Sequence, residues 1–282
     1  MLIDTPTDLL GGLKPSQFMR RHWQKKPLLV RQAMPGVTSP ASRVALFALA
    51  QRDDVESRLV VRQGERWTLR QGPLPRRALP PLAQTGWSLL IQGLDLHVDA
   101  AHALLRPFRF LPETRLDDLM VSYATEGGGV GPHIDSYDVF LLQVQGQRRW
   151  RIGPCRQPQW RMDVPLKMLV SFEATDEWVL SPGDMLYLPP GWAHDGVAVG
   201  GDCMTASIGF RAPTAGELAQ ALLPLLADSV DAEGPRYRDG GADPAVHAGL
   251  VPAPLQAFAR QALVGVLADC VLVERALGQW IT

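Results

Sequence analysis

Short hydrophobic runs separated by polar turns dominate the first 211 residues of the chain. The runs at 87–91 and 119–123 are too short for typical helices and are bounded by turn-forming or polar residues, so they predict buried strands. The segment 57–74 alternates between hydrophobic and polar positions around Gly64, which predicts a β-hairpin. Helical rhythm is confined to short stretches that we expect to support the strands from outside. The pattern therefore predicts a mainly β fold with helices.

The pattern changes near the carboxyl end of the chain. Thr214 and Glu217 have the T-x-x-E spacing of a capping box, so a helix is expected to begin there. A polar, glycine-rich connector then precedes a second helical region at about 254–280, in which Leu and Val recur on all sides. These features divide the chain into a β domain at 1–211, with helical support near its amino terminus, and a helical region at 212–282.

The composition indicates an ordinary globular protein. Hydrophobic residues make up 46% and charged residues 20% of the 282 residues. The formal net charge is −1, which argues against broad affinity for nucleic acid. We therefore expect no direct nucleic-acid binding.

The three cysteines, Cys155, Cys203 and Cys270, form no C-x-x-C pair. An odd number of widely spaced cysteines argues against a disulfide framework and against a structural zinc site. The amino terminus lacks the basic segment and hydrophobic core of a signal peptide, and no run reaches the length of a membrane span. These features predict a cytoplasmic protein that does not associate with membranes.

A histidine and an aspartate two positions apart open a hydrophobic run in the middle of the chain. Because side chains alternate along a strand, His133 and Asp135 would point to the same side and could bind one metal ion together. His194, which follows a Pro-Pro-Gly turn, is the third candidate. Two imidazoles and one carboxylate form the facial triad of non-haem Fe(II) enzymes, which leaves coordination positions open. The alternative is that each histidine is a hydrogen-bonded structural residue.

The glycines and prolines near these residues favour the metal site. Five residues separate Gly127 from His133, which gives one half of a cupin-type pattern. Five residues also separate Gly183 from Pro189, in the half-pattern that ends at His194. Two half-patterns in the right order are more specific than any single motif.

The hydrophobic run that follows predicts a β-hairpin with its turn at 144–147. In the returning strand, Arg148, Trp150 and Ile152 share one face, which the Trp and Ile side chains mark as buried. A buried guanidinium needs an anion, and its planar fork suits a carboxylate. Beside a facial triad, Arg148 could bind the distal carboxylate of 2-oxoglutarate, whose other end would chelate the iron. The alternative is a structural ion pair with Asp138.

Three segments resemble the JmjC-type ribosomal oxygenases of bacteria: GPHIDSYDVFLLQVQGQRRWRIG, LSPGDMLYLPPGWAHDG and SIGFRAP. The amino-terminal phrase FMRRHWQKKPLLVRQAMPG is also typical of that family. The resemblance implies a cupin-like double-stranded β-helix, or jelly roll, that uses Fe(II) and 2-oxoglutarate. It also implies hydroxylation of the β-carbon of an arginine in the large-subunit ribosomal protein numbered sixteen. Related eukaryotic enzymes hydroxylate histidines in other ribosomal proteins, so such a target is the alternative.

The resemblance also suggests how the substrate arginine is bound. We expect a pocket beside the metal and two further hydrogen-bond donors to the cosubstrate. The pocket residues are Asp118, Met120 and Tyr137, and the two donors are Ser122 and Ser207. Tyr137 lies two positions after Asp135 and would share its face in a regular strand. Asp117 and Asp118 could instead form a solvated loop.

In the family, a helical region like the one at 212–282 forms a homodimer interface, so we expect a homodimer. Family members also carry a winged-helix domain after these helices, and we expect this domain to be absent from the chain. Two rival functions are a cupin enzyme that uses no 2-oxoglutarate and a non-catalytic module that binds ribosomes. The H-x-D pair and Arg148 argue against the first rival, and the complete triad argues against the second.

Overall fold

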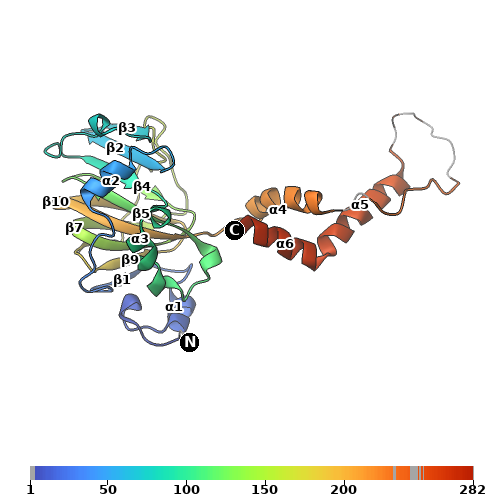
Figure 1. Cartoon of the computed structure of the whole chain (residues 1–282), viewed down its shortest axis with the longest axis horizontal. Coiled ribbons are helices and arrows are strands. Elements are labelled where there is room, and N and C mark those ends of the chain that lie inside the picture. Colours follow the sequence, from blue (N-terminus) through green and yellow to red (C-terminus); the bar gives the residue numbers. More distant parts are fainter. Residues whose placement is uncertain (1–3, 231–232, 242–246, 248, 250, 282) are drawn as a thin grey trace. The chain divides into compact units, whose positions relative to one another are not determined.

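Two units make up the chain, Met1–Ala212 and Pro213–Thr282. The computed structural model describes residues 4–230, 233–241, 247, 249 and 251–281. All described strands belong to the first unit, and the described elements of the second unit are helices (Figure 1).

Ten antiparallel strands form one sheet in the first unit (Figure 1). Their order along the main path is β1-β9-β7-β10-β5-β4-β2-β3, while β6 pairs with β10 and β8 pairs with β7. The strands are β1 (Leu28–Val30), β2 (Ser57–Gln63), β3 (Arg66–Gln71), β4 (Trp87–Ile91), β5 (Leu116–Ala124), β6 (His133–Ile134), β7 (Asp138–Pro154), β8 (Asp176–Leu180), β9 (Met185–Leu188) and β10 (Trp192–Phe210). The predicted mainly β fold is confirmed, and β2 and β3 form the predicted hairpin around Gly64.

Strands β7 and β10 are long enough to belong to two halves of the sheet. The first half of β7 pairs with β9 and its second half with β8, while both halves pair with β10. Gly146, with φ of 61°, lies at the bend of β7, near the register shift between Val199 and Met204 of β10. The sheet therefore closes into a double-stranded β-helix. The predicted hairpin with its turn at 144–147 is wrong. Gly146 bends a single continuous strand, which keeps the same antiparallel direction against β10 on both sides of the glycine.

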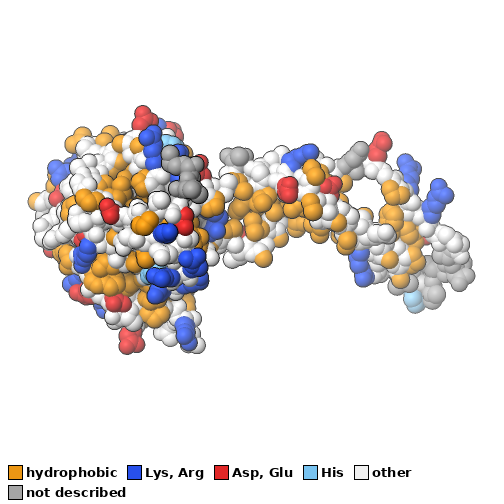
Figure 2. Space-filling view, turned by 90° about the horizontal axis from the view of Figure 1, so that it is seen from below, with side chains coloured by type: hydrophobic (Ala, Val, Ile, Leu, Met, Phe, Trp, Pro, Cys, Tyr) orange, Lys and Arg blue, Asp and Glu red, His pale blue; other side chains and the backbone are white. Residues whose placement is uncertain are grey.

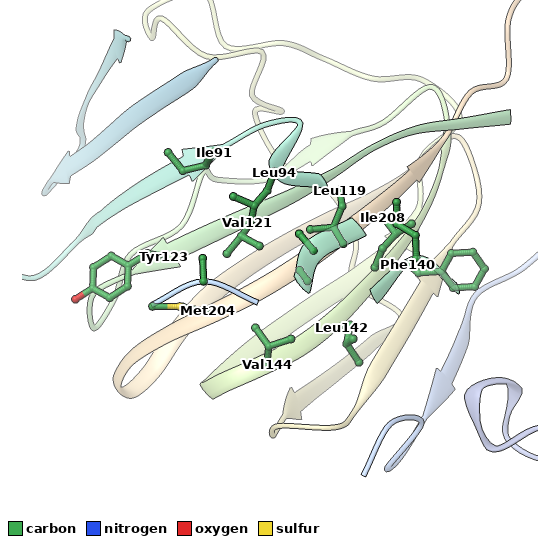
Figure 3. Packing of buried hydrophobic residues seen from close by; sticks show 14 of the residues in the cluster. Ile91, Leu94, Leu119, Val121, Tyr123, Phe140, Leu142, Val144, Met204 and Ile208 are labelled. Atoms are coloured by element: carbon green, nitrogen blue, oxygen red, sulfur yellow. The ribbon is translucent and has the colours of Figure 1, made fainter. Parts of the chain in front are cut away.

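One face of the sheet carries the main hydrophobic core. On β7, Phe140, Leu142 and Val144 alternate with residues of the opposite face and belong to this cluster, part of which is shown in Figure 3. Phe18 and Phe47 bring the amino-terminal helices into the same core. The helices of this unit are α1 (Pro15–Arg21), α2 (Arg43–Leu49) and α3 (Asp99–Leu104), with short 3-10 helices at Asp8–Leu10, Arg76–Ala78, Leu94–Leu96, Arg106–Phe108 and Glu113–Arg115.

The opposite face of the sheet lines the interior of the β-helix and carries polar residues. Residues two apart on a strand share a face, and the register aligns them across neighbouring strands. Arg58 of β2 pairs with Leu90 of β4, and Leu90 pairs with Ser122 of β5. Ser122 in turn pairs with Thr205 of β10. Four strands that are far apart in the sequence therefore contribute to one row of side chains.

The second unit contains three described helices, α4 (Ala215–Ser229), α5 (Ala253–Ala268) and α6 (Cys270–Ile281). Thr214 and Glu217 form the predicted capping box at the start of α4. The predicted helical region at about 254–280 consists of two helices, because α5 and α6 differ in direction by 65°.

Hydrophobic side chains are widely exposed on these helices, and Figure 2 shows them over this unit in orange. No residue of α5 is buried, and Leu263 is 66% exposed. By length and composition, none of the described helices could cross a membrane alone, although α5 and α6 would pass that test as a bent pair.

Candidate functional site

The three predicted metal ligands meet at one point. Strand β6 pairs with β10 so that His133 and His194 are direct cross-strand partners, and their ring centroids lie 4.1 Å apart. The carboxylate of Asp135 lies 3.9 Å from Nε2 of His133 and 3.4 Å from Nε2 of His194. The ligand atoms of all three residues lie within 4.8 Å of one another, which suits a single bound ion.

Backbone carbonyls determine which imidazole nitrogen is free to bind a metal. Nδ1 of His133 donates to the carbonyl oxygen of Gly131 at 2.9 Å, and Nδ1 of His194 donates to that of Trp192 at 3.0 Å. Because a carbonyl oxygen only accepts hydrogen bonds, both neutral rings carry their proton on Nδ1 and present the lone pair of Nε2. Metal-binding histidines are commonly oriented in this way.

The charges of the three residues also suit a cation. Burial, aided by His194, lowers the pKa of His133 to about 4, so this imidazole is neutral at physiological pH. Burial alone would raise the pKa of Asp135, but its hydrogen bond to His194 and the charges of both histidines lower that pKa to about 2. Burial opposes the charged form of His194, yet its hydrogen bond with Asp135 raises the pKa of His194. A bound metal would compete with this shared proton.

Two glycines allow close packing around the ligands. Gly131 has φ of 78°, and a Cβ at this position would overlap the side chain of Met168. A Cβ on Gly196 would overlap the ring of Trp150. Because Gly196 has no side chain, the Trp150 ring lies 5.8 Å from the ring of His194.

A cavity of about 250 Å³ opens beside the triad, and we call it the inner cavity. Three of its lining side chains carry a buried N–H group without a hydrogen-bond partner among the described residues. These groups are Nε of Arg58, Nε of Arg148 and Nε1 of Trp150. Buried donors are nearly always satisfied in folded proteins, so the inner cavity suits a ligand rich in hydrogen-bond acceptors.

Arg148 is the main cation of the inner cavity. It is 4% exposed, and no Asp or Glu of the described chain lies within ion-pair distance of it. Its Nη1 donates to Oγ of Ser122 at 2.8 Å and to Oγ1 of Thr205 at 3.2 Å, and its guanidinium lies over the Trp150 ring. A buried guanidinium without an anion is costly, so a carboxylate is the expected ligand.

The alternative partner, Asp138, does not bind Arg148. Its carboxylate accepts hydrogen bonds from the hydroxyl of Tyr187 at 2.6 Å and from Nε2 of Gln24 at 3.1 Å. Arg148 lies on the buried face of β7 together with Trp150 and Ile152, as the alternation of residues predicts.

A second cavity of about 410 Å³ adjoins the first, and we call it the outer cavity. Met120, Asp135, Tyr137 and Ser207 line both cavities, so Asp135 of the triad lies at the boundary between them, while the two histidines line the inner cavity. Asp118 lines the outer cavity but not the inner one. The structure therefore brings together the three residues expected to bind substrate, and Asp118 belongs to strand β5 rather than to a solvated loop.

Hydrogen-bond acceptors collect in the outer cavity. Burial raises the pKa of Asp118 to about 6 against the hydrogen bond from Gly93, and the nearby Asp117 and Glu56 add to this effect. Oε1 of Gln92, which also lines this cavity, is buried without a partner among the described residues. An entering cation would stabilise the charged form of Asp118 and could donate to Gln92.

Several residues of the site were not expected from the sequence, namely Arg58, Gln92, Gln143 and Thr205. A polar residue within a hydrophobic strand is the signal that could have found Thr205, which stands between Met204 and Ala206. Of the two serines predicted to bind the cosubstrate, Ser122 accepts a hydrogen bond from Arg148, whereas Ser207 lines both cavities.

Comparisons with known proteins agree with this geometry. A model of the JmjC domain matches residues 103–218. Ribosomal protein uL16 3-hydroxylase of Escherichia coli (strain K12) is 44% identical over 202 residues, which cover 71% of this chain and 53% of that protein. The chain spans about half the length of the curated relatives it matches.

Solved structures of similar proteins extend the comparison to nearly the whole chain. The X-ray structure of E. coli ycfD matches with a TM-score of 0.84 and 36% identity, and the match covers 94% of this chain and 71% of that chain. A structure of YcfD, described as a ribosomal oxygenase in complex with cobalt and 2-oxoglutarate, matches with a TM-score of 0.80 and 35% identity over 94% of this chain and 70% of that one. The chain therefore belongs to the family of JmjC-type ribosomal oxygenases.

Proposed function

We propose that the protein is an Fe(II)- and 2-oxoglutarate-dependent hydroxylase that acts on the β-carbon of an arginine in ribosomal protein uL16. The observation that carries this proposal is the set of buried, unpartnered donors on Arg58, Arg148 and Trp150 beside the metal triad. A dicarboxylate that binds the metal at one end would meet these donors with the other. The YcfD structure with cobalt and 2-oxoglutarate supports this choice of ligand, because its fold matches this chain.

The chain's own residues would bind and orient the reactants. His133, Asp135 and His194 would hold Fe(II), while Arg148 and Ser122 would bind the distal carboxylate of 2-oxoglutarate. When bound, iron and 2-oxoglutarate together supply the oxidising chemistry that hydroxylates an unactivated carbon. The protein would therefore contribute mainly alignment and the exclusion of water.

Two features argue against the rival functions. A cupin enzyme that uses no dicarboxylate would leave Arg148 buried without an anion. A non-catalytic module would not need imidazoles whose Nε2 lone pairs are held towards one point by backbone carbonyls.

The outer cavity supports an arginine as the target. A guanidinium carries five N–H donors, which suits a cavity with the carboxyl group of Asp118 and the unpartnered oxygen of Gln92. Tyr137 and Met120 would contact the aliphatic part of the arginine, and Ser207 would lie near the cosubstrate as a further donor. Histidine, the alternative target, carries fewer donors to satisfy these acceptors.

The chain would act as a homodimer on its ribosomal substrate in the cytoplasm. The support for a dimer is the exposed hydrophobic surface of the helices in 212–282, which includes Leu263, Val264 and Leu267 of α5. Replacing Leu263 and Leu267 with Glu should convert the dimer to a monomer in sedimentation experiments, whereas Gln256→Glu on the same helix should not. A wild-type protein that sediments as a monomer would contradict the dimer.

The proposed activity is tested with protein loaded anaerobically with Fe(II) and supplied with 2-oxoglutarate, oxygen and a peptide of uL16. We expect succinate release and the addition of one oxygen atom to an arginine, seen by tandem mass spectrometry, and both should be lost in His133→Ala. Oxygen added to a histidine would favour the alternative target. A protein that binds neither the metal nor 2-oxoglutarate would contradict the proposal.

A further inference from the structure

We propose that Gln143 and Thr205 are positioning residues that determine the affinity and the chain-length selectivity for the dicarboxylate cosubstrate by holding Arg148. This inference rests on the proposed function of the inner cavity. Neither residue lines that cavity, so neither would touch the cosubstrate.

A chain of buried hydrogen bonds leads from the bend of β7 to Arg148. Nε2 of Gln143 donates to the carbonyl oxygens of Gln145 at 2.8 Å and Gly146 at 3.3 Å. Oγ1 of Thr205 donates to Oε1 of Gln143 at 2.9 Å, and Nη1 of Arg148 donates to Oγ1 of Thr205 at 3.2 Å. Gln143 and Thr205 are both 0% exposed, so water does not compete for these bonds.

The direction of every bond in this chain is determined. The two carbonyl oxygens can only accept, so they hold the NH2 group of Gln143 towards the bend and its oxygen towards Thr205. An amide oxygen also only accepts, so the Thr205 hydroxyl must donate its proton to Gln143. The lone pairs of Thr205 therefore remain available for Arg148, whose guanidinium can only donate.

The anchor of this hydrogen-bond chain lies at a tightly packed bend of β7. A Cβ on Gly146 would overlap the backbone oxygen of Asp202, and Gly146 has φ of 61°. The strand can therefore bend here only with glycine, and the two carbonyl groups that hold Gln143 keep a constant position.

The hydrogen bonds of Arg148 engage one nitrogen of its guanidinium and leave another without a partner. Nη1 of Arg148 is engaged by Ser122 and Thr205, while its Nε is buried on the cavity wall without a partner. The Trp150 ring, 5.2 Å from the guanidinium carbon, lies along its face. The hydroxyl of Thr205 thus sets how far Arg148 reaches into the inner cavity, and so the length of the dicarboxylate that spans from the metal to Arg148.

The test compares Thr205→Val, which keeps the shape and removes the hydroxyl, with Thr205→Ser, which keeps the hydroxyl. We expect KM for 2-oxoglutarate to rise roughly tenfold in Thr205→Val, as for the loss of a hydrogen bond to a charged group. The kcat at saturating 2-oxoglutarate and KM for the peptide should change less than about twofold. Thr205→Ser should restore wild-type KM, and Gln143→Met should resemble Thr205→Val, which provides a second variant if the first folds poorly.

Two binding measurements separate a positioning role from a general structural one. Calorimetric titration of Mn(II)-loaded protein should show weaker binding of 2-oxoglutarate to Thr205→Val but unchanged binding of 2-oxobutyrate, which has no distal carboxylate. The preference for 2-oxoglutarate over the longer 2-oxoadipate should also decrease. Equal affinities of wild type and Thr205→Val for 2-oxoglutarate would overturn the positioning role, as would an equal loss for 2-oxobutyrate. A wild type that binds no 2-oxo acid would instead overturn the proposed function itself.

Discussion

The inner and outer cavities share one wall but differ in the chemistry of their buried, unpartnered atoms. The inner cavity has N–H donors on Arg148 and Trp150 that lack a partner in the described chain, while the unpartnered Nε of Arg58 belongs to a residue that lines both cavities. The outer cavity has the unpartnered carbonyl oxygen of Gln92 and the carboxyl group of Asp118, whose pKa burial raises to about 6. One cavity is thus suited to an anion and the other to a donor-rich cation.

Under the proposed function, one sheet would bind two reactants of opposite charge on either side of the metal. Strands β2, β5 and β10 contribute side chains to both cavities, and a shift of a few positions along these strands separates the two. Arg58 and Lys167 also line the outer cavity, but neither forms an ion pair with an acid of the described chain. Asp117 pairs with Arg211 at 2.8 Å, so Asp118 rather than Asp117 is the acid of this cavity that remains available to a substrate.

The largest effect is expected at the metal site, where the two cavities meet. Removing a ligand in His133→Ala or Asp135→Ala should abolish metal binding and reduce turnover by more than about a hundredfold. Mutating a residue that merely hydrogen-bonds to a metal ligand already lowers metal affinity or activity by up to about a hundredfold. Metal analysis and succinate release measure this effect. His102→Ala, at an exposed histidine of α3, should keep both properties. Full turnover in Asp135→Ala would contradict the assignment of the triad.

A large effect confined to the inner cavity is expected for Arg148→Ala. The variant removes the cation that is proposed to bind the distal carboxylate, so KM for 2-oxoglutarate should rise roughly a hundredfold, as for one lost partner of a buried charge pair. KM for the peptide should stay nearly constant. Arg151→Ala is the matched control, because Arg151 lies on the opposite face of β7, where it forms a surface ion pair with Glu177 and lies over the ring of Phe172. A larger change in peptide KM than in 2-oxoglutarate KM would contradict the assignment of Arg148 to the cosubstrate.

A moderate effect confined to the outer cavity is expected for Asp118→Asn. The ionised carboxylate attracts a guanidinium, so peptide binding by the wild type should weaken as pH falls through about 6, the raised pKa of Asp118. Asp118→Asn should raise peptide KM roughly tenfold at pH 8, as for a lost charge-assisted hydrogen bond. It should also remove the decrease in affinity between pH 7 and pH 5. A peptide KM in Asp118→Asn that equals the wild-type value at pH 8 would exclude this role.

The same substitution should stabilise the protein without ligands. The pKa of Asp118 is about 6 in the folded chain against an ordinary value of 3.8, so folding favours the protonated form. The contribution of Asp118 to the free energy of unfolding is fully present below pH 3.8 and is lost as pH rises to about 6. The free energy of unfolding changes by about 3 kcal/mol between these limits. The free energy of unfolding of Asp118→Asn should therefore exceed that of the wild type at pH 8, and the advantage should disappear near pH 4. Urea unfolding at both pH values measures this difference.

The smallest effect is expected at Gln92, which is neutral. Gln92→Leu should raise peptide KM a few-fold, as for one neutral hydrogen bond, and leave KM for 2-oxoglutarate unchanged. Gln92→Glu keeps an acceptor and should retain peptide binding. If Gln92→Leu weakens a peptide with norleucine at the target position, which has no N–H donor in its side chain, as strongly as one with arginine, the contact with the guanidinium is refuted.

The triad and Arg148 could be predicted because strand alternation and motif spacing act over short distances in the sequence. Gln92 could not, because it follows β4, and only the pairing of β4 with β5 brings it to the cavity that Asp118 lines. Gly146 predicts a turn, because glycine is used both in hairpins and in bent strands. The two cases differ only in the pairing: here both halves of β7 pair with the same strand, β10. Buried polar atoms without partners, as in Gln92, are invisible in a sequence.

The most direct test of the division between the cavities is a crossed binding experiment. Affinities for 2-oxoglutarate and for the uL16 peptide are measured by calorimetry on Mn(II)-loaded wild type, Arg148→Ala and Asp118→Asn. The structure predicts that Arg148→Ala weakens 2-oxoglutarate binding alone and that Asp118→Asn weakens peptide binding alone. Weakening of both ligands to the same extent by either variant, or the reverse pairing, would contradict the account.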